Sequence, residues 1–180
     1  KSFEWPPKDF TEIAELQKLL QVAHFFLFSL TSGARISESL SLKPGCVTES
    51  SDGIALANGR TYKLTSSVSG LERNWPLPTL ALEGLKQQEK LAKASINLGM
   101  LSVDNQGNEL KNSESLWLSL SREGAFTANI NYFLKKTTRV LGLEEQLGGI
   151  NIHTHRFRKT IARLVALSLV GAPKILIDLF

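Results

Sequence analysis

Three turn pairs interrupt the apolar residues between positions 47 and 77, and they restrict this part of the chain to short strands. Asp52-Gly53, Asn58-Gly59 and Ser69-Gly70 each place a short polar side chain before a glycine. Such pairs favour tight turns, because glycine adopts the positive φ that many hairpin turns require. Asn58-Gly59 is the strongest of the three hairpin signals. The stretch therefore predicts a small antiparallel sheet.

The residues before this stretch predict a long helix. Asp9 with Glu12 three residues later resembles a capping box, and Gly33 ends the pattern. Between them, apolar residues recur at helical spacing and predict a buried face. That face consists of Ile13, Leu16, Leu19, Leu20, Ala23 and Leu27. His24 lies among apolar neighbours and is interpreted as a core histidine.

Four further helices are expected. A short one carries Arg35 and ends at Lys43-Pro44-Gly45, because proline cannot continue a helix. Another runs from Pro78-Thr79 to about Asn97, with Lys86, Lys90 and Lys93 on its outer side. A third is capped by Thr127 and contains Ile130, Phe133, Leu134 and Val140. The last presents a stripe of Phe157, Ile161, Leu164, Val165 and Ser168. The fold class predicted is α+β, mainly helical, with a small antiparallel sheet.

Composition sets wide bounds on function. The chain has 180 residues, 42% of them hydrophobic, and no break in composition, so a single domain spanning residues 1–180 is predicted. A net charge of +4 is compatible with a polyanionic partner but does not require one. Cys46 is the only cysteine, which excludes an intramolecular disulfide and a cysteine-based metal cluster in this chain. Without an apolar run long enough for a membrane span, the protein is expected to be soluble and cytoplasmic.

Two segments more than a hundred residues apart place arginines in short, partly apolar helical patterns. They read TSGARISE at residues 31–38, with Arg35, and HRFRKT at residues 155–160, with Arg158. Two guanidinium groups brought together by a fold form a site for a tetrahedral oxyanion such as a DNA phosphodiester. Lys63 lies between the two segments, where a β-hairpin would deliver it to the same phosphate.

In this order, the features resemble the catalytic domain of the tyrosine recombinases, the phage integrase family. Residues 31–42 follow the pattern Thr-x-Gly-x-Arg-x-x-Glu-x-x-x-Leu, a hairpin lysine comes next, and His-x-x-Arg is then followed by a basic residue and threonine. The resemblance covers nearly the whole chain, and three short motifs in the family's order are more specific than any one of them. It implies the family's helical catalytic domain with a small antiparallel sheet.

The resemblance also implies a role for each residue at a matching position. Arg35 and Arg158 correspond to the two catalytic arginines, which clamp the non-bridging oxygens of the scissile phosphate. Lys63 corresponds to the hairpin lysine that protonates the 5′-oxygen leaving group, and His155 to the histidine that assists proton transfer and phosphate binding. Glu38 corresponds to the acidic residue that supports the site. No metal and no other cofactor is implied.

Two overlapping His-x-x-Arg patterns are present, and their register decides between them. In the family, the residue before the arginine is apolar and packs into the core, and a basic residue and a small one follow the arginine. Phe157 before Arg158 meets these requirements, whereas His155 before Arg156 does not. His155 and Arg158, rather than His153 and Arg156, are therefore the predicted pair.

The nucleophile departs from the family pattern. The tyrosines of the chain, Tyr62 and Tyr132, both precede the His-x-x-Arg motif, whereas the family's nucleophile follows it. We therefore expect the chain to be a fragment whose tyrosine segment lies beyond Phe180 and whose N-terminal core-binding domain is also missing. Such a fragment would not cleave DNA alone. In full length, the family acts as a tetramer on paired sites in double-stranded DNA, which in a prokaryote would place it at the nucleoid when bound.

Other interpretations stay open. A non-catalytic DNA-binding or regulatory relative would keep the phosphate clamp without a nucleophile, and a helical domain unrelated to nucleic acids would scatter Arg35, Lys63 and Arg158 in space. Arg35 and Glu38 at i, i+3 spacing are also typical of a surface ion pair. Five further cations flank the proposed site and are candidate phosphate contacts: Arg60, Arg73, Arg156, Lys159 and Arg163.

Overall fold

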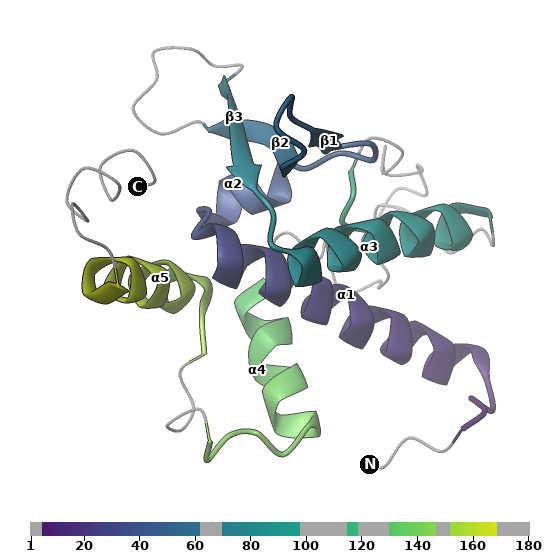
Figure 1. Ribbon diagram of the computed structural model, residues 1–180. Helices are drawn as coiled ribbons and strands as arrows, with labels where there is room; N and C mark the ends of the chain where they lie inside the picture. Colours follow the sequence, from purple (N-terminus) through teal and green to yellow (C-terminus); the bar gives the residue numbers. More distant parts are fainter. Residues whose placement is uncertain (1–4, 62–69, 98–114, 119–129, 147–151, 169–180) are drawn as a thin grey trace.

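The computed structural model describes residues 5–61, 70–97, 115–118, 130–146 and 152–168. Within them the protein is α+β and mainly helical, with five helices and one three-stranded antiparallel sheet (Figure 1). The predicted fold class is confirmed at this level. The helices are α1 (Phe10–Ser32), α2 (Ile36–Leu40), α3 (Thr79–Asn97), α4 (Ile130–Val140) and α5 (Thr154–Ser168). The strands are β1 (Val47–Glu49), β2 (Ala55–Thr61) and β3 (Leu71–Pro76).

Helix α1 lies at the centre of the molecule and contacts each of the other four helices (Figure 1). Its ends are those predicted. The backbone N–H of Glu12 donates a 2.8 Å hydrogen bond to Oδ1 of Asp9, and Gly33 ends the helix in the left-handed region at φ 61°. These caps satisfy backbone groups that the helix itself cannot pair.

The predicted buried face of α1 is wrong, because none of its six residues is fully buried. Ile13, Leu20 and Ala23 are exposed, and the three leucines at 16, 19 and 27 are half-buried. Gln17, Gln21 and His24 are buried instead. The remainder of the buried face is formed by Val22, Phe25, Phe28, Ser29 and Ser32. A prediction based on apolar residues alone misplaced the buried face of α1, because such a prediction assigns glutamine to the surface. A buried amide is tolerated when its hydrogen bonds are made inside the protein.

A network of buried side chains makes those hydrogen bonds. Oε1 of Gln21 accepts from Gln88 Nε2 of α3 and from the backbone N–H of Leu118, both at 2.8 Å. Nε2 of Gln21 donates to the Leu118 carbonyl at 2.8 Å. His24 Nδ1 lies 3.0 Å from Gln88 Oε1, so the predicted core histidine is confirmed as buried. The network joins α1 to α3 and to the buried residues 116–118.

The sheet has the order β1-β2-β3, and one of its predicted turns is wrong. Asp52-Gly53 does form the turn between β1 and β2, with Gly53 at φ 73°. Asn58-Gly59, however, lies inside β2, where Gly59 pairs with Arg73. Glycine is needed there for space, because a Cβ atom at Gly59 would lie 2.9 Å from the Trp75 ring and 3.1 Å from Leu42. At this position the glycine is explained by the close packing of Trp75 and Leu42 rather than by a turn.

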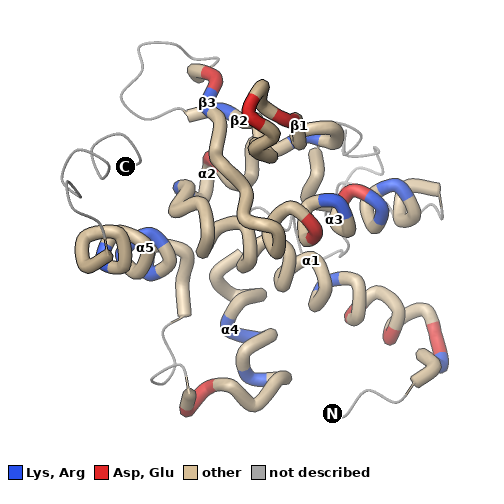
Figure 2. Tube along the Cα trace, in the orientation of Figure 1, with Lys and Arg blue, Asp and Glu red and all other residues tan. Residues whose placement is uncertain are grey.

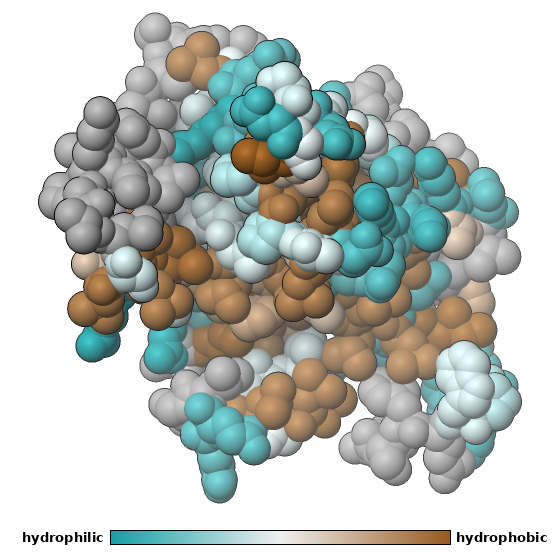
Figure 3. All heavy atoms as spheres, in the orientation of Figure 1, coloured by the Kyte–Doolittle hydropathy of each residue, from teal (hydrophilic) through white to brown (hydrophobic). Residues whose placement is uncertain are grey.

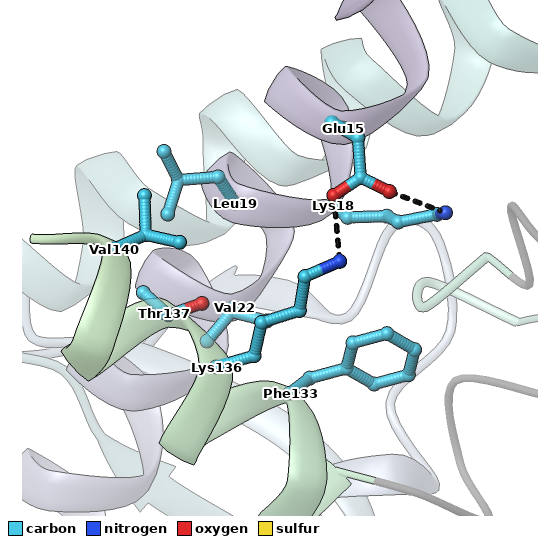
Figure 4. Close-up of a pocket in the computed structure, with 8 residues that line it drawn as sticks. All are labelled: Glu15, Lys18, Leu19, Val22, Phe133, Lys136, Thr137 and Val140. Atoms are coloured by element: carbon cyan, nitrogen blue, oxygen red, sulfur yellow. Dashed lines mark hydrogen bonds and ion pairs between the residues drawn. The ribbon is translucent and has the colours of Figure 1, made fainter. Parts of the chain in front are cut away.

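Helices α4 and α5 pack on α1 in different ways. Lys136 of α4 lies 2.9 Å from Glu15 of α1, which also binds Lys18, above a small pocket between the two helices (Figure 4). Phe157 of α5 is buried, and its ring centroid lies 5.1 Å from that of Phe26. The rest of the predicted stripe is only partly covered: Ile161 and Val165 are half-buried, whereas Leu164 is 52% exposed and Ser168 is exposed as well.

Apolar surface therefore lies along α5, and Figure 3 shows apolar residues at that place. Helix α3 follows its prediction more closely. Leu85 and Ala92 are buried, whereas Lys86, Lys90 and Lys93 are exposed. None of the helices within the described residues is both long and apolar enough to cross a membrane.

The contact at Gly59 gives a stability prediction. Replacement by alanine should lower the free energy of unfolding by about 1–3 kcal/mol, because the added methyl group has no room beside Trp75. This loss should exceed the small gain that alanine brings in a strand. The measurement is urea unfolding, with the exposed Ser51→Ala as a control that should change little. A Gly59→Ala protein as stable as the wild type would contradict the packing described.

Candidate anion-binding site

The N-terminal ends of α2 and α5 face a common pocket of about 530 Å³. Residues 34–37 line it from one side, and Thr154, His155 and Arg158 line it from the other. The structure thus brings together Arg35, His155 and Arg158, three of the residues singled out in the sequence. Figure 2 marks the basic residues of α5 in blue. Their catalytic roles remain predictions.

The turn between α1 and α2 sets the position of Arg35. Gly33 reverses the chain in the left-handed region, and Arg35 follows in extended conformation as the N-cap of α2. Arg158 reaches back to the same turn, because its Nη1 donates a 3.0 Å hydrogen bond to the Gly33 carbonyl. The Arg158 side chain of α5 is therefore held against the backbone of the α1–α2 turn.

Glu38 holds Arg35 in place without lining the pocket. Its side chain is only 1% exposed, and its two oxygens accept hydrogen bonds from three donors. The backbone N–H of Arg35 lies 2.7 Å from Oε2, and Arg35 Nη1 and Thr61 Oγ1 each lie 2.8 Å from Oε1. Glu38 thereby orients the Arg35 guanidinium and ties it to β2. The i, i+3 ion pair considered for Arg35 and Glu38 is present, but its carboxylate is buried rather than at the surface.

Opposing effects act on the carboxyl of Glu38. Burial favours its neutral form and raises its pKa, but the hydrogen bonds from the Arg35 backbone, from Thr61 and from the Arg35 guanidinium favour the charged form. Together they outweigh the burial and hold the pKa of Glu38 below its ordinary value. The carboxylate is therefore charged at neutral pH.

For Arg158, burial and most of the neighbouring charges act in the same direction and disfavour its charged form. Burial lowers the pKa of its guanidinium, and the positive charges of Arg35 and Arg73 lower it further, while Glu38 opposes them. Arginine stays protonated in proteins, so the lowered pKa reflects first the burial of this guanidinium and then the like charges held near it. An anion between Arg35 and Arg158 would relieve this repulsion. A tetrahedral oxyanion suits the planar, forked donors of both residues.

His155 and His153 differ in their surroundings. His155 is exposed on the first turn of α5 and lines the pocket, whereas His153 precedes the helix and is not among the lining residues. Their rings stack with centroids 6.3 Å apart. Partial burial, followed by the charges of His155 and Arg156, lowers the pKa of His153. The buried ring of Phe157 agrees with the register that selected His155 and Arg158.

The remaining predicted residues lie in several places. Lys63 falls within 62–69 and lies outside the described residues. Arg60 is exposed on the opposite face of β2 from Thr61, because side chains alternate along a strand. Its side chain contributes instead to a second hollow of about 360 Å³. Three cations of α5 are exposed: Arg156, Lys159 and Arg163.

Arg73 makes a contact that the sequence did not indicate. It lies against Glu38, with its Nη1 3.7 Å from Oε1, rather than on the open surface. Sequence reasoning also missed Thr61, and it gave Ser37 and Thr154 of the lining no role. The alternation of side chains along β3 could have indicated the position of Arg73. Arg73 and the buried Trp75 are two residues apart and so share a face of the strand.

Among the described residues, no group of three or more His, Cys, Asp or Glu side chains is arranged to hold a metal ion. Comparison with known proteins adds no assignment: no protein-family model matches the chain, and no curated protein matches it either. The geometry of the pocket and the sequence motifs are therefore the basis for a functional proposal.

The buried carboxylate gives a prediction with a defined pH dependence. Because the pKa of folded Glu38 lies below its ordinary value, its charged form stabilises the fold at neutral pH. That stabilisation should be lost as the pH falls from the ordinary carboxyl pKa through the lowered one. Glu38→Gln should cost about 3 kcal/mol of unfolding free energy at pH 7. The difference from the wild type should shrink toward pH 3.

Urea unfolding of both proteins between pH 7 and pH 3 measures this effect. Glu83→Gln is the matched control, because Glu83 is exposed on α3 and its pair with Lys86 is at the surface. Equal stability of Glu38→Gln and the wild type at pH 7 would show that the buried carboxylate does not support the site.

Proposed function

We propose that this chain is the catalytic domain of a tyrosine recombinase, which cuts and rejoins DNA at specific sites as part of a longer protein. One observation carries the proposal: Arg35 and Arg158, more than a hundred residues apart in sequence, line one pocket together with His155. The motifs around them and the mainly helical fold with a three-stranded antiparallel sheet are compatible with the resemblance to the phage integrase family.

In the proposed reaction, Arg35 and Arg158 bind the two non-bridging oxygens of the scissile phosphate. Negative charge on these oxygens grows as phosphorus becomes pentavalent, so donors that are already oriented stabilise the transition state more than the ground state. Glu38 contributes by holding the Arg35 guanidinium before the substrate arrives. Lysine at either arginine position would provide a charge but not the two-pronged donor.

A tyrosine hydroxyl of the full-length protein is proposed to attack the phosphorus and to give up its proton to a base, for which His155 is the proposed acceptor. The bond from phosphorus to the 5′-oxygen breaks, a 3′-phosphotyrosyl bond forms, and the departing 5′-oxygen takes a proton. Lys63 is the proposed donor of that proton, with His155 assisting proton transfer and phosphate binding. Attack by a 5′-hydroxyl on the phosphotyrosyl bond then rejoins a strand. Double-stranded DNA is the proposed partner, bound by a tetramer on paired sites, and no cofactor takes part.

A second candidate is a DNA-binding or regulatory relative that keeps the phosphate clamp and has no nucleophile. Within the described residues, Tyr132 is 57% exposed on α4 and does not line the pocket, so neither candidate uses it as the nucleophile. Incubating the full-length protein with a nicked duplex separates the two candidates. A covalent protein–DNA adduct that resists denaturation supports the recombinase, and its absence with intact DNA binding supports the relative.

DNA binding by the chain itself tests the pocket. Arg158→Ala should weaken binding to a short duplex about tenfold at low salt, since it removes one charged phosphate contact. The slope of log affinity against log salt should fall by about one. Fluorescence anisotropy at several salt concentrations measures both.

The matched control is Arg139→Ala, because Arg139 is exposed at the end of α4 and pairs with Glu144. This variant removes the same charge at a residue that does not line the pocket, and it should leave affinity and slope nearly unchanged. If Arg139→Ala weakens binding as much as Arg158→Ala, the binding is diffuse and the proposed phosphate clamp is wrong.

A further inference from the structure

Arg73 is held in a fixed place beside the pocket without lining it. Its side chain is 21% exposed, and its Nη1 lies 3.7 Å from Oε1 of Glu38. Its guanidinium carbon also lies 5.6 Å from the ring centroid of Trp75, which is buried. An ion pair and a cation–π contact thus hold the same guanidinium. Among the described residues, Arg35 and Arg158 belong to the pocket lining, but Arg73 does not.

Arg73 changes the charge balance of the whole cluster. Arg35 and Arg73 both lie within 4 Å of Glu38, and Arg158 is close enough for both of them to lower the pKa of its guanidinium, after the effect of its own burial. Three guanidinium groups and one carboxylate leave an excess of two positive charges. Without Arg73, Glu38 would cancel one of the two pocket arginines, and the excess would be one.

We infer that Arg73 sets the charge preference of the pocket, so that a doubly negative oxyanion binds in preference to a singly negative one. The argument is Coulombic: an added positive charge nearby stabilises an anion in proportion to the anion's own charge. This inference rests on the proposed function, in which a singly charged phosphodiester becomes more negative in the pentavalent transition state. Arg73 is then a positioning and specificity-determining residue, acting through Glu38 and through its charge rather than by touching the phosphate.

A purely structural role for Arg73 has a different signature. If its contacts with Glu38 and Trp75 only anchored β3, its loss would weaken the binding of every anion by the same factor. The ratio of two affinities, one for a doubly charged and one for a singly charged anion, would then stay constant. The ratio also does not depend on the fraction of protein that is folded.

The experiment compares sulfate, a dianion, with dimethyl phosphate, a monoanion of similar tetrahedral shape. Both are titrated into the labelled 180-residue chain at pH 7 and low ionic strength, and NMR signals of the Arg35 and Arg158 side chains report binding. Wild-type protein should prefer sulfate. Arg73→Gln should reduce the sulfate-to-dimethyl-phosphate affinity ratio about tenfold, the size expected for one additional screened charge pair. Arg73→Lys, which keeps the charge, should retain most of the ratio.

Arg139→Gln is the control for net charge, because it removes one positive charge at an exposed site of α4. Its ratio should equal that of the wild type. If Arg73→Gln does not fold, Arg73→His replaces it, and its ratio should fall as the imidazole loses its proton between pH 5.5 and 8. The affinity ratio of the wild-type protein, measured over the same pH range, corrects for the protonation of His153 and His155.

The outcomes separate the inference from the proposed function. Binding of both anions with an unchanged ratio in Arg73→Gln overturns the role of Arg73 and leaves the phosphate clamp intact. If neither anion shifts the Arg35 and Arg158 signals in the wild type, the clamp itself fails and the inference fails with it. A ratio lost equally in Arg73→Lys would also overturn the inference, because charge would not be the cause.

Discussion

The buried carboxylate of Glu38 is the interaction on which the arrangement of the candidate site depends. It accepts hydrogen bonds from Arg35 and Thr61 and pairs with Arg73, so one side chain connects α2, β2 and β3. Removing a carboxylate from water is costly unless donors surround it, and here they hold its pKa below the ordinary value. The same contacts leave the Arg35 guanidinium in the pocket that Arg158 reaches from α5.

Much of the fold follows from local sequence signals, because these signals act through the backbone. Asp9 and Gly33 set the ends of α1, and Asp52-Gly53 forms a hairpin turn as predicted. The antiparallel sheet and helix α3 are likewise where the sequence placed them. The meeting of Arg35 and Arg158 in one pocket was expected through a family resemblance rather than through spacing, since no local rule relates residues so far apart.

The failures share a cause, which is that tertiary contacts override local patterns. Asn58-Gly59 predicts a turn by its backbone preference, but the ring of Trp75 on the neighbouring strand β3 leaves room only for glycine at position 59. The amide of Gln21 is buried because its partners come from α3 and from residues 116–118. The contact of Arg73 with a carboxylate on another element was likewise not indicated by the sequence. In each case the deciding partner is distant in sequence.

The central claim is that Arg35 and Arg158 together hold a phosphate of DNA, and NMR detection of arginine side chains tests it most directly. A short duplex is titrated into the labelled chain at low salt, and the Nε–Hε signals are followed. The account predicts that the signals of Arg35 and Arg158 shift with the same dissociation constant, while that of Arg139 on α4 stays in place. Unchanged signals from both pocket arginines, with shifts confined to cations elsewhere on the surface, would contradict it.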